Sequence, residues 1–234
     1  MNIERLFEKL SYGELSNLSM SVEGSGTIDE NAQPRILNFA NEGLSSLFSQ
    51  FNLLEKQLVL ELREGISNYQ LKSEFAYSKH DSNSENDWFI LDSDDEPFLD
   101  DIILITEVMA SNGDSLPIND PSCPESVFTP QEKLLQVPRI LLGSALSVKY
   151  RANHPLLTME DLTQEILLPL VLEKALTSWI AYNVYSSMNG PENSSKAQEY
   201  MSMFTSICNN AESMNLVNNS SGSSNSRFVR GGWV

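Results

Sequence analysis

The sequence has few cysteines, few basic residues and no long apolar run. Its two cysteines, Cys123 and Cys208, lie far apart and lack the spacing of a metal site, which favours two free thiols over a disulfide. No stretch approaches the roughly 18 consecutive apolar residues of a membrane span, and the charged first residues are not typical of a signal peptide. We therefore expect a protein of a reducing compartment, without a membrane partner.

Signatures of catalysis are also scarce. The two histidines, His80 and His154, are isolated from each other, and there is no serine elbow and no glycine-rich phosphate loop. The acidic run from Asp92 to Asp101 invites a calcium site, but it lacks the central glycine and closing glutamate of the helix-loop-helix calcium loop. We expect no enzyme activity, no cofactor and no metal. A metal-dependent hydrolase that uses some of the carboxylates is the alternative from the enzyme class.

Basic residues are missing altogether from the middle of the chain. The net charge is −17, and residues 81–132 contain fourteen acidic residues without one lysine or arginine. Most of the surface would repel nucleic acid. An acidic surface would either let DNA slide past without sticking, because it offers phosphates no counter-charge, or serve solubility alone. The candidate residues of this acidic surface or channel are Asp92, Asp94, Asp95, Glu96, Asp100 and Asp101.

Helical periodicity is present at both ends of the chain. Apolar residues recur every three or four positions at 3–10, at 34–51 and through the last third. A capping box at Ser11 predicts a short second helix directly after the first. The last third predicts two antiparallel helices, one beginning near the capping signal at Thr158 and the other beginning at Pro191.

The middle of the chain has the alternating pattern of β-strands. Alternation at 58–62 and at 69–71, on either side of a turn at Arg63-Glu-Gly-Ile66, predicts a β-hairpin. A strand at 102–110 that ends at the turn signal Asn112-Gly113 is also expected, with residues 116–118 returning beside it. The further predicted strands cover 134–140 and 144–150.

These patterns together predict an α+β fold. The N- and C-terminal helices form a helical bundle, and a β-rich, sandwich-like domain is inserted between them, followed by an extended C-terminal tail. The expected parts are 1–53 for the N-terminal helices, 54–153 for the inserted β-rich domain, 154–216 for the C-terminal helical hairpin and 217–234 for the flexible tail with its anchor.

The end of the tail has the composition of an anchor. Two cations and four apolar side chains follow a spacer of Asn, Ser and Gly. Exposed aromatic side chains lower solubility unless a partner buries them. A frayed terminus without a role is the alternative. The candidate anchor residues are Arg227, Phe228, Val229, Arg230, Trp233 and Val234.

Several segments have the order and spacing of one known group of proteins. The segments are Leu10-Ser-Tyr-Gly-Glu-Leu-Ser-Asn-Leu18, the helix Pro34-Arg-Ile-Leu-Asn-Phe-Ala-Asn-Glu-Gly-Leu44, Glu64-Gly-Ile-Ser-Asn-Tyr69, Val148-Lys-Tyr-Arg-Ala-Asn-His-Pro155, Leu168-Pro-Leu, Ala175-Leu and Ala181-Tyr-Asn. In these segments the chain resembles the head-to-tail adaptor proteins of tailed bacteriophages. The resemblance covers most of the chain, but residues 77–130 show no pattern of that family.

The resemblance implies a structural protein of the virion neck, not an enzyme. Such adaptors form a ring, commonly dodecameric, between the portal protein and the tail tube or nozzle protein, and the encapsidated DNA passes through the channel without specific binding. Assembly would take place in the host cytoplasm, and the anchor at Arg227–Val234 would bind the portal. The alternative is an interaction or decoration protein that forms no ring and uses its tail as a linear ligand.

Overall fold

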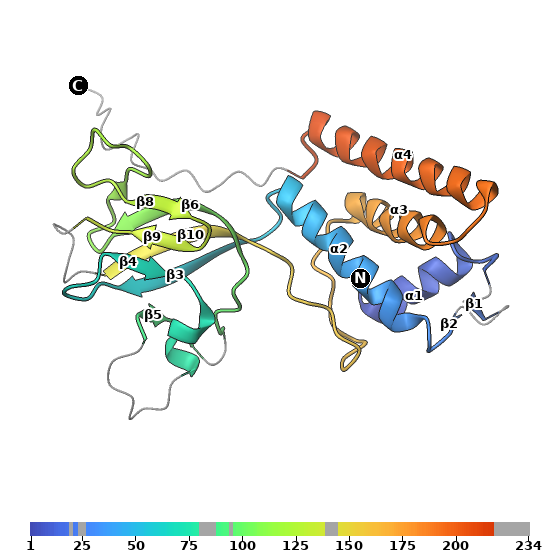
Figure 1. The fold of residues 1–234 in the computed structure, drawn as a ribbon, viewed down its shortest axis with the longest axis horizontal. Coiled ribbons are helices and arrows are strands. Elements are labelled where there is room, and N and C mark those ends of the chain that lie inside the picture. The colour runs from blue at the N-terminus through green and yellow to red at the C-terminus, as the bar shows by residue number, and fades with distance from the viewer. Residues whose placement is uncertain (19–20, 23–26, 80–87, 94–95, 139–144, 218–234) are drawn as a thin grey trace, which may run out of the picture. The chain divides into compact units, whose positions relative to one another are not determined.

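The computed structural model belongs to the α+β class and divides into two units (Figure 1). The helical unit comprises Met1–Leu53 and Leu157–Val234, and the β unit comprises Leu54–Leu156. The β unit is thus an insertion in the sequence of the helical unit. The structure describes residues 1–18, 21–22, 27–79, 88–93, 96–138 and 145–217.

Four helices make up most of the described part of the helical unit. The predicted helices at 3–10 and 34–51 are confirmed, and the second contains Pro34 in its first turn, where the missing N–H leaves no hydrogen bond unmade. The elements are α1 (Ile3–Tyr12), the short paired strands β1 (Ser21–Val22) and β2 (Thr27–Ile28), α2 (Gln33–Gln50), α3 (Leu170–Ser186) and α4 (Pro191–Ser213).

The helix predicted to begin at Ser11 does not form. Ser11 is the last but one residue of α1, and its hydroxyl donates to the backbone oxygen of Thr27 at 3.1 Å. Residues 13–17 form turns instead. The side chain that resembled an N-cap therefore stabilises a contact between α1 and β2, which the local sequence could not reveal.

The predicted start of the first C-terminal helix is also wrong. The helix begins at Leu170 and not near Thr158, because Pro169 disfavours the helical conformation in the residue before it. Upstream of it, the carboxylate of Asp161 accepts hydrogen bonds from the amide and hydroxyl of Thr163, at 2.9 and 2.6 Å, which closes a turn. The second helix does begin at Pro191, as predicted.

The central helix of the helical unit is α3. It contacts α1, α2 and α4, as Figure 1 shows. Apolar residues therefore occupy most of its circumference, where the sequence predicted one apolar face. The side chains of Leu172, Leu176, Ile180 and Val184 are at most 1% exposed.

A glycine allows α2 and α3 to approach closely. A Cβ atom at Gly43 would lie 2.7 Å from Cδ1 of Trp179 and 2.9 Å from Cδ1 of Leu176. Both distances are too short for carbon atoms in a packed interior. Any larger residue at this position would therefore push the two helices apart or displace both side chains.

Two ion pairs join α1 and the turn after it to α3. Lys9 pairs with Glu173, and the Nζ atom of Lys174 lies 2.5 Å from Oε1 of Glu14. The same Glu14 oxygen accepts a hydrogen bond from the hydroxyl of Thr177 at 2.7 Å. Neighbouring residues of α3 thus carry opposite charges, each matched by its partner, which fixes the alignment of the two segments.

The described part of the β unit contains two antiparallel sheets. One has the strand order β5-β3-β10-β6-β7 and the other has the order β4-β9-β8. The strands are β3 (Glu55–Glu61), β4 (Asn68–Gln70), β5 (Ile90–Leu91), β6 (Ile102–Ala110), β7 (Ser115–Leu116), β8 (Phe128–Gln131), β9 (Leu134–Gln136) and β10 (Ala145–Ala152). Two short 3₁₀ helices, η1 (Ser73–Phe75) and η2 (Tyr77–Lys79), precede β5.

The strand at 102–110 is confirmed, but the predicted hairpin is wrong. The turn after β6 contains Gly113 at φ +86°, a conformation that favours glycine. In place of a hairpin, β3 pairs with β10 and β5, whereas β4 pairs with β9. Alternation identified both strands, but their partners lie far away in the sequence.

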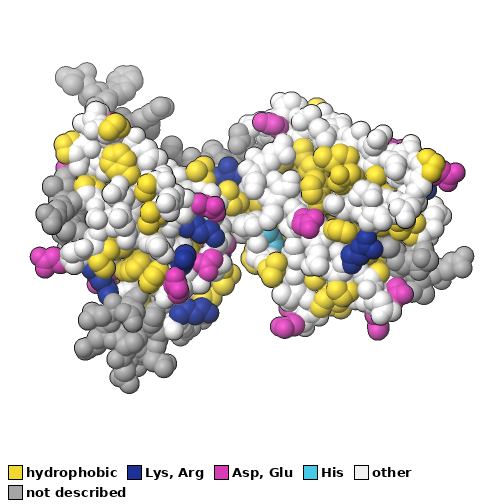
Figure 2. Space-filling view, in the orientation of Figure 1, with side chains coloured by type: hydrophobic (Ala, Val, Ile, Leu, Met, Phe, Trp, Pro, Cys, Tyr) yellow, Lys and Arg dark blue, Asp and Glu magenta, His cyan; other side chains and the backbone are white. Residues whose placement is uncertain are grey.

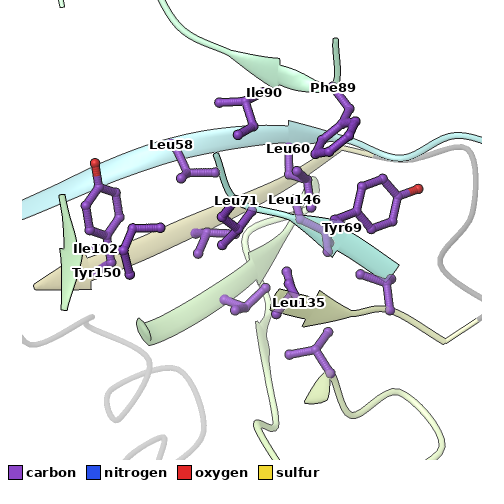
Figure 3. Close-up of a cluster of buried hydrophobic side chains, with 14 of the residues drawn as sticks. Leu58, Leu60, Tyr69, Leu71, Phe89, Ile90, Ile102, Leu135, Leu146 and Tyr150 are labelled. Atoms are coloured by element: carbon purple, nitrogen blue, oxygen red, sulfur yellow. The ribbon is translucent and has the colours of Figure 1, made fainter. Parts of the chain in front are cut away.

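The two sheets share one hydrophobic core (Figure 3). Tyr69 and Tyr150 lie at opposite ends of the cluster in Figure 3, and each hydroxyl has polar partners. The hydroxyl of Tyr69 lies within 3.3 Å of the backbone oxygens of Arg63 and Ile66. The residues of the core that are completely buried are Leu60, Tyr69, Leu71, Ala76, Ile90, Val108, Val127, Leu135, Leu146 and Val148.

Candidate functional surfaces

The side chains of His154 and Cys208 are both buried. Burial lowers the pKa of His154 below its usual 6.5, although the hydrogen bond between Nδ1 and the Pro155 oxygen opposes this effect. Burial raises the pKa of the Cys208 thiol to about 11. His80 lies outside the described residues. Within the described ranges, no three side chains of His, Cys, Asp or Glu are grouped so that they could hold a metal ion.

Asp101, from the predicted acidic surface, is an internal residue of the β unit. It is 9% exposed. Its carboxylate oxygens accept hydrogen bonds from Nζ of Lys56 at 2.6 Å and from the hydroxyl of Tyr150 at 3.2 Å. Burial raises the pKa of Tyr150, and the nearby carboxylate of Asp101 raises it further. The prediction that Asp101 belongs to an exposed acidic surface is therefore wrong, because its carboxylate is buried and paired inside the β unit.

Asp100 holds the turn before β6. Its backbone is in the left-handed region, at φ 59°, which residues other than glycine adopt only infrequently. Its carboxylate accepts hydrogen bonds from the amide and the hydroxyl of Ser73, both at 2.6 Å, and its backbone oxygen accepts one from Nζ of Lys133 at 2.6 Å. These bonds connect η1 and the turn between β8 and β9 to the start of β6.

Asp92 likewise connects η2 to the segment before β6 through hydrogen bonds. Its carboxylate accepts hydrogen bonds from the amide and the hydroxyl of Ser78, at 2.8 and 2.6 Å, and from the amide of Phe98 at 2.9 Å. Burial raises the pKa of Asp92, but these hydrogen bonds together outweigh burial and hold the pKa below its usual 3.8. Of the other predicted residues, Glu96 is exposed, and Asp94 and Asp95 lie outside the described residues.

We expect Asp92 to make the stability of the β unit depend on pH in acid. Because the folded-state pKa is lowered, the stabilisation is complete above about pH 4 and is lost as the pH falls through the folded-state value. In Asp92→Asn, the free energy of unfolding should therefore fall less steeply between about pH 4 and pH 2 than in the unchanged protein. Urea unfolding at a series of pH values measures this slope. Glu96→Gln is the control, and an equal change of slope in both variants would contradict the assignment.

An exposed apolar surface lies at the start of α3. The side chain of Leu170 is 82% exposed, and those of Leu167 and Val171 are 44% and 41% exposed. Figure 2 shows hydrophobic side chains gathered on the helical unit over the region of α3 and α4. This surface was not among the sites predicted from the sequence, although apolar residues beyond one face of α3 were a signal for it.

The outward side of α4 lacks charge over half of the helix. From Tyr200 to Ala211 no residue is charged, although the whole chain carries −17. Depletion of charge is typical of the buried part of protein interfaces. The exposed polar residues of this stretch are Ser202, Thr205, Ser206, Asn209 and Asn210.

The last described residue, Val217, lies beside the end of α2. Val217 is 7% exposed and lines a cavity of about 160 Å³ together with Gln50, Phe51 and Asn52. The tail is therefore attached to the unit up to this residue. All six predicted anchor residues, Arg227, Phe228, Val229, Arg230, Trp233 and Val234, lie outside the described residues.

No protein-family model matches this chain, and no curated protein has a significant similarity to it. None of the helices in the described ranges is both long enough and apolar enough to cross a membrane.

Proposed function

We propose that the protein is a structural virion protein, a head-to-tail adaptor that forms a ring between the portal and the tail. In this proposal the helical unit is a bundle and the β unit is a sandwich-like insertion. The ring, dodecameric in the family that the sequence resembles, lines the channel through which the encapsidated DNA passes. The protein acts as part of the virion neck and is no enzyme.

Two uncharged patches on the surface of the helical unit carry this proposal. Leu170 and Val171 expose apolar side chains at the start of α3, and α4 presents uncharged residues between 200 and 211. A strongly acidic chain would repel its own copies unless the contacting surfaces were free of charge. Contact through two different faces closes a ring when the rotation between copies allows it.

The chemistry of the tail supports the proposed contact with the portal. Its last eight residues contain two arginines, and Phe228 and Trp233 are aromatic. Arginine and tryptophan are among the residues that contribute most to binding at interfaces. Each copy would contribute one tail of modest affinity, and the copies of a ring would then act together.

The proposal is tested by the mass of the protein in solution, measured by light scattering alone and after mixing with the portal protein of the same virus. We expect a stoichiometric ring on the portal, since many weak contacts form at once on a circular template. Separate particles at every salt concentration would rule out the adaptor role.

The second candidate is a decoration protein that uses its tail as a linear ligand. The observation that favours it is the same basic and aromatic tail, which needs no ring to bind a partner. The mixing experiment separates the two functions, because a decoration protein would bind without forming a closed ring.

A further inference from the structure

A groove on the helical unit lies between α1, β2 and the start of α2. It has a volume of about 690 Å³, which is within the range of roughly 300–1,000 Å³ found for ligand pockets. Its apolar part is formed by Phe7, Ile28 and Leu162. The remaining lining residues are Asn2, Glu4, Arg5, Glu8, Thr27 and Gln33.

The groove is rigid where it is apolar. Phe7 and Ile28 are 5% and 2% exposed, so both are held in the core of the unit. Leu162 is fixed from the other side, because its backbone oxygen accepts a hydrogen bond from the amide of Glu4 at 3.2 Å. A preformed apolar surface of this kind loses little entropy when it binds a side chain.

The groove is surrounded by negative charge. Glu4 and Glu8 line it and are exposed, whereas Arg5 is the one cation among the described residues that line it. The segments that contribute Ile28 and Leu162 carry further acidic residues on their flanks. These are Asp29, Glu30, Glu160, Asp161 and Glu165.

We propose that this groove binds the C-terminal segment Arg227–Val234 of a second copy of the chain. The segment combines the two features that the groove would recognise. Arg227 and Arg230 complement the carboxylates of the groove, and Phe228 and Trp233 supply apolar side chains for its floor. The whole chain has 32 acidic against 15 basic residues, so a segment with two cations and no carboxylate side chain is unusual in it.

The length of the spacer, residues 218–226, favours binding of the segment Arg227–Val234 to the groove of a second copy over the groove of its own chain. Val217 lies beside Gln50 at the end of α2, whereas the groove includes Gln33 at its start. The 18 residues of α2 span about 27 Å at ~1.5 Å per residue. The spacer 218–226 reaches about 30 Å only when it is fully extended, and about 15–18 Å as a flexible coil. A groove on another molecule requires no such extension.

This contact goes beyond the proposed function, because it needs no portal. The groove and the segment are different surfaces, so the contact is heterologous and can be repeated from copy to copy. The portal would compete with the groove for the same segment. A free protein would therefore associate weakly with itself, and would lose that association when the portal takes up its tail.

The test is the binding of a labelled peptide, Arg-Phe-Val-Arg-Gly-Gly-Trp-Val, to the full-length protein, measured by fluorescence anisotropy. The double variant Glu4→Gln with Glu8→Gln should weaken binding about fivefold, as expected for two exposed charge pairs. The control is Glu192→Gln with Glu199→Gln, which removes the same charge from exposed positions of α4. A peptide with Ala in place of Phe and Trp should bind about 30-fold more weakly.

Analytical ultracentrifugation of the full-length protein tests whether the groove is occupied by the C-terminal segment of a second copy. We expect association that increases with protein concentration and is reversed by an excess of the unlabelled peptide. Equal peptide binding by the two double variants would overturn the groove as the site. A protein that binds the peptide but stays monomeric at concentrations well above the peptide's Kd would overturn the second copy.

These outcomes are independent of the adaptor role. The double variant Glu4→Gln with Glu8→Gln should still attach to the portal as the unchanged protein does. Failure of the peptide to bind refutes the groove contact while leaving the portal experiment intact, and failure on the portal leaves the groove contact intact.

Discussion

Replacing Asp101 by Asn should lower the free energy of unfolding of the β unit by about 2–3 kcal/mol. The variant keeps the shape of the side chain but removes the charge that Lys56 faces at 2.6 Å. It also weakens the acceptor of the Tyr150 hydroxyl, which is buried. Urea unfolding followed by circular dichroism measures the loss, and hydrogen exchange across β10 assigns it to the β unit.

Glu96→Gln is the matched control for this prediction. It removes one carboxylate charge from the same acidic run, but at an exposed position, and should change stability by less than about 0.5 kcal/mol. If neither variant lost stability, Asp101 would contribute only to surface charge. If both variants lost the same amount of stability, the acidic run would act through its total charge and not through particular contacts.

Replacing Phe228 and Trp233 by Ala should weaken attachment to the portal by at least about 30-fold, because buried aromatic anchors contribute most of the energy of such contacts. The fold should be retained. The residues before the pair are Asn, Ser and Gly, and so polar a spacer does not connect the anchor to a hydrophobic core. A pull-down on the portal protein measures attachment, and thermal unfolding measures the fold.

Ser223→Ala with Ser224→Ala serves as the control for the tail. These residues lie in the spacer, so their replacement should leave attachment unchanged. Unchanged attachment of the aromatic variant would show that the tail does not bind the portal. Loss of attachment together with loss of thermal stability would show that the two aromatic residues belong to the fold.

The acidic run shows why a candidate site was difficult to interpret from its residues alone. The sequence gives the density of carboxylates, and this suggested an exposed surface or channel. The structure pairs Asp92 with Ser78, Asp100 with Ser73 and Asp101 with Lys56. A carboxylate that accepts such hydrogen bonds is a structural element, and its partners were 14 to 45 positions away.

The strands illustrate the same limit. The alternation at 58–62 was recognised because side-chain direction in a strand follows a local period of two. Its pairing with β10 was missed, since backbone hydrogen bonds to a distant strand leave no trace in local composition. The hairpin was the natural prediction because the nearest alternating segment lay just beyond a turn.

The sequence by itself determined the features that depend on near neighbours. Helical periodicity located α1 and α2, proline located the start of α4, and alternation followed by Asn112-Gly113 located β6. The tertiary structure alone decided which elements meet. It placed α3 at the centre of its unit, turned three carboxylates into internal acceptors and formed the groove beside α1. The physical reason is that conformational preference is local, whereas burial and charge pairing depend on residues that are brought together only by folding.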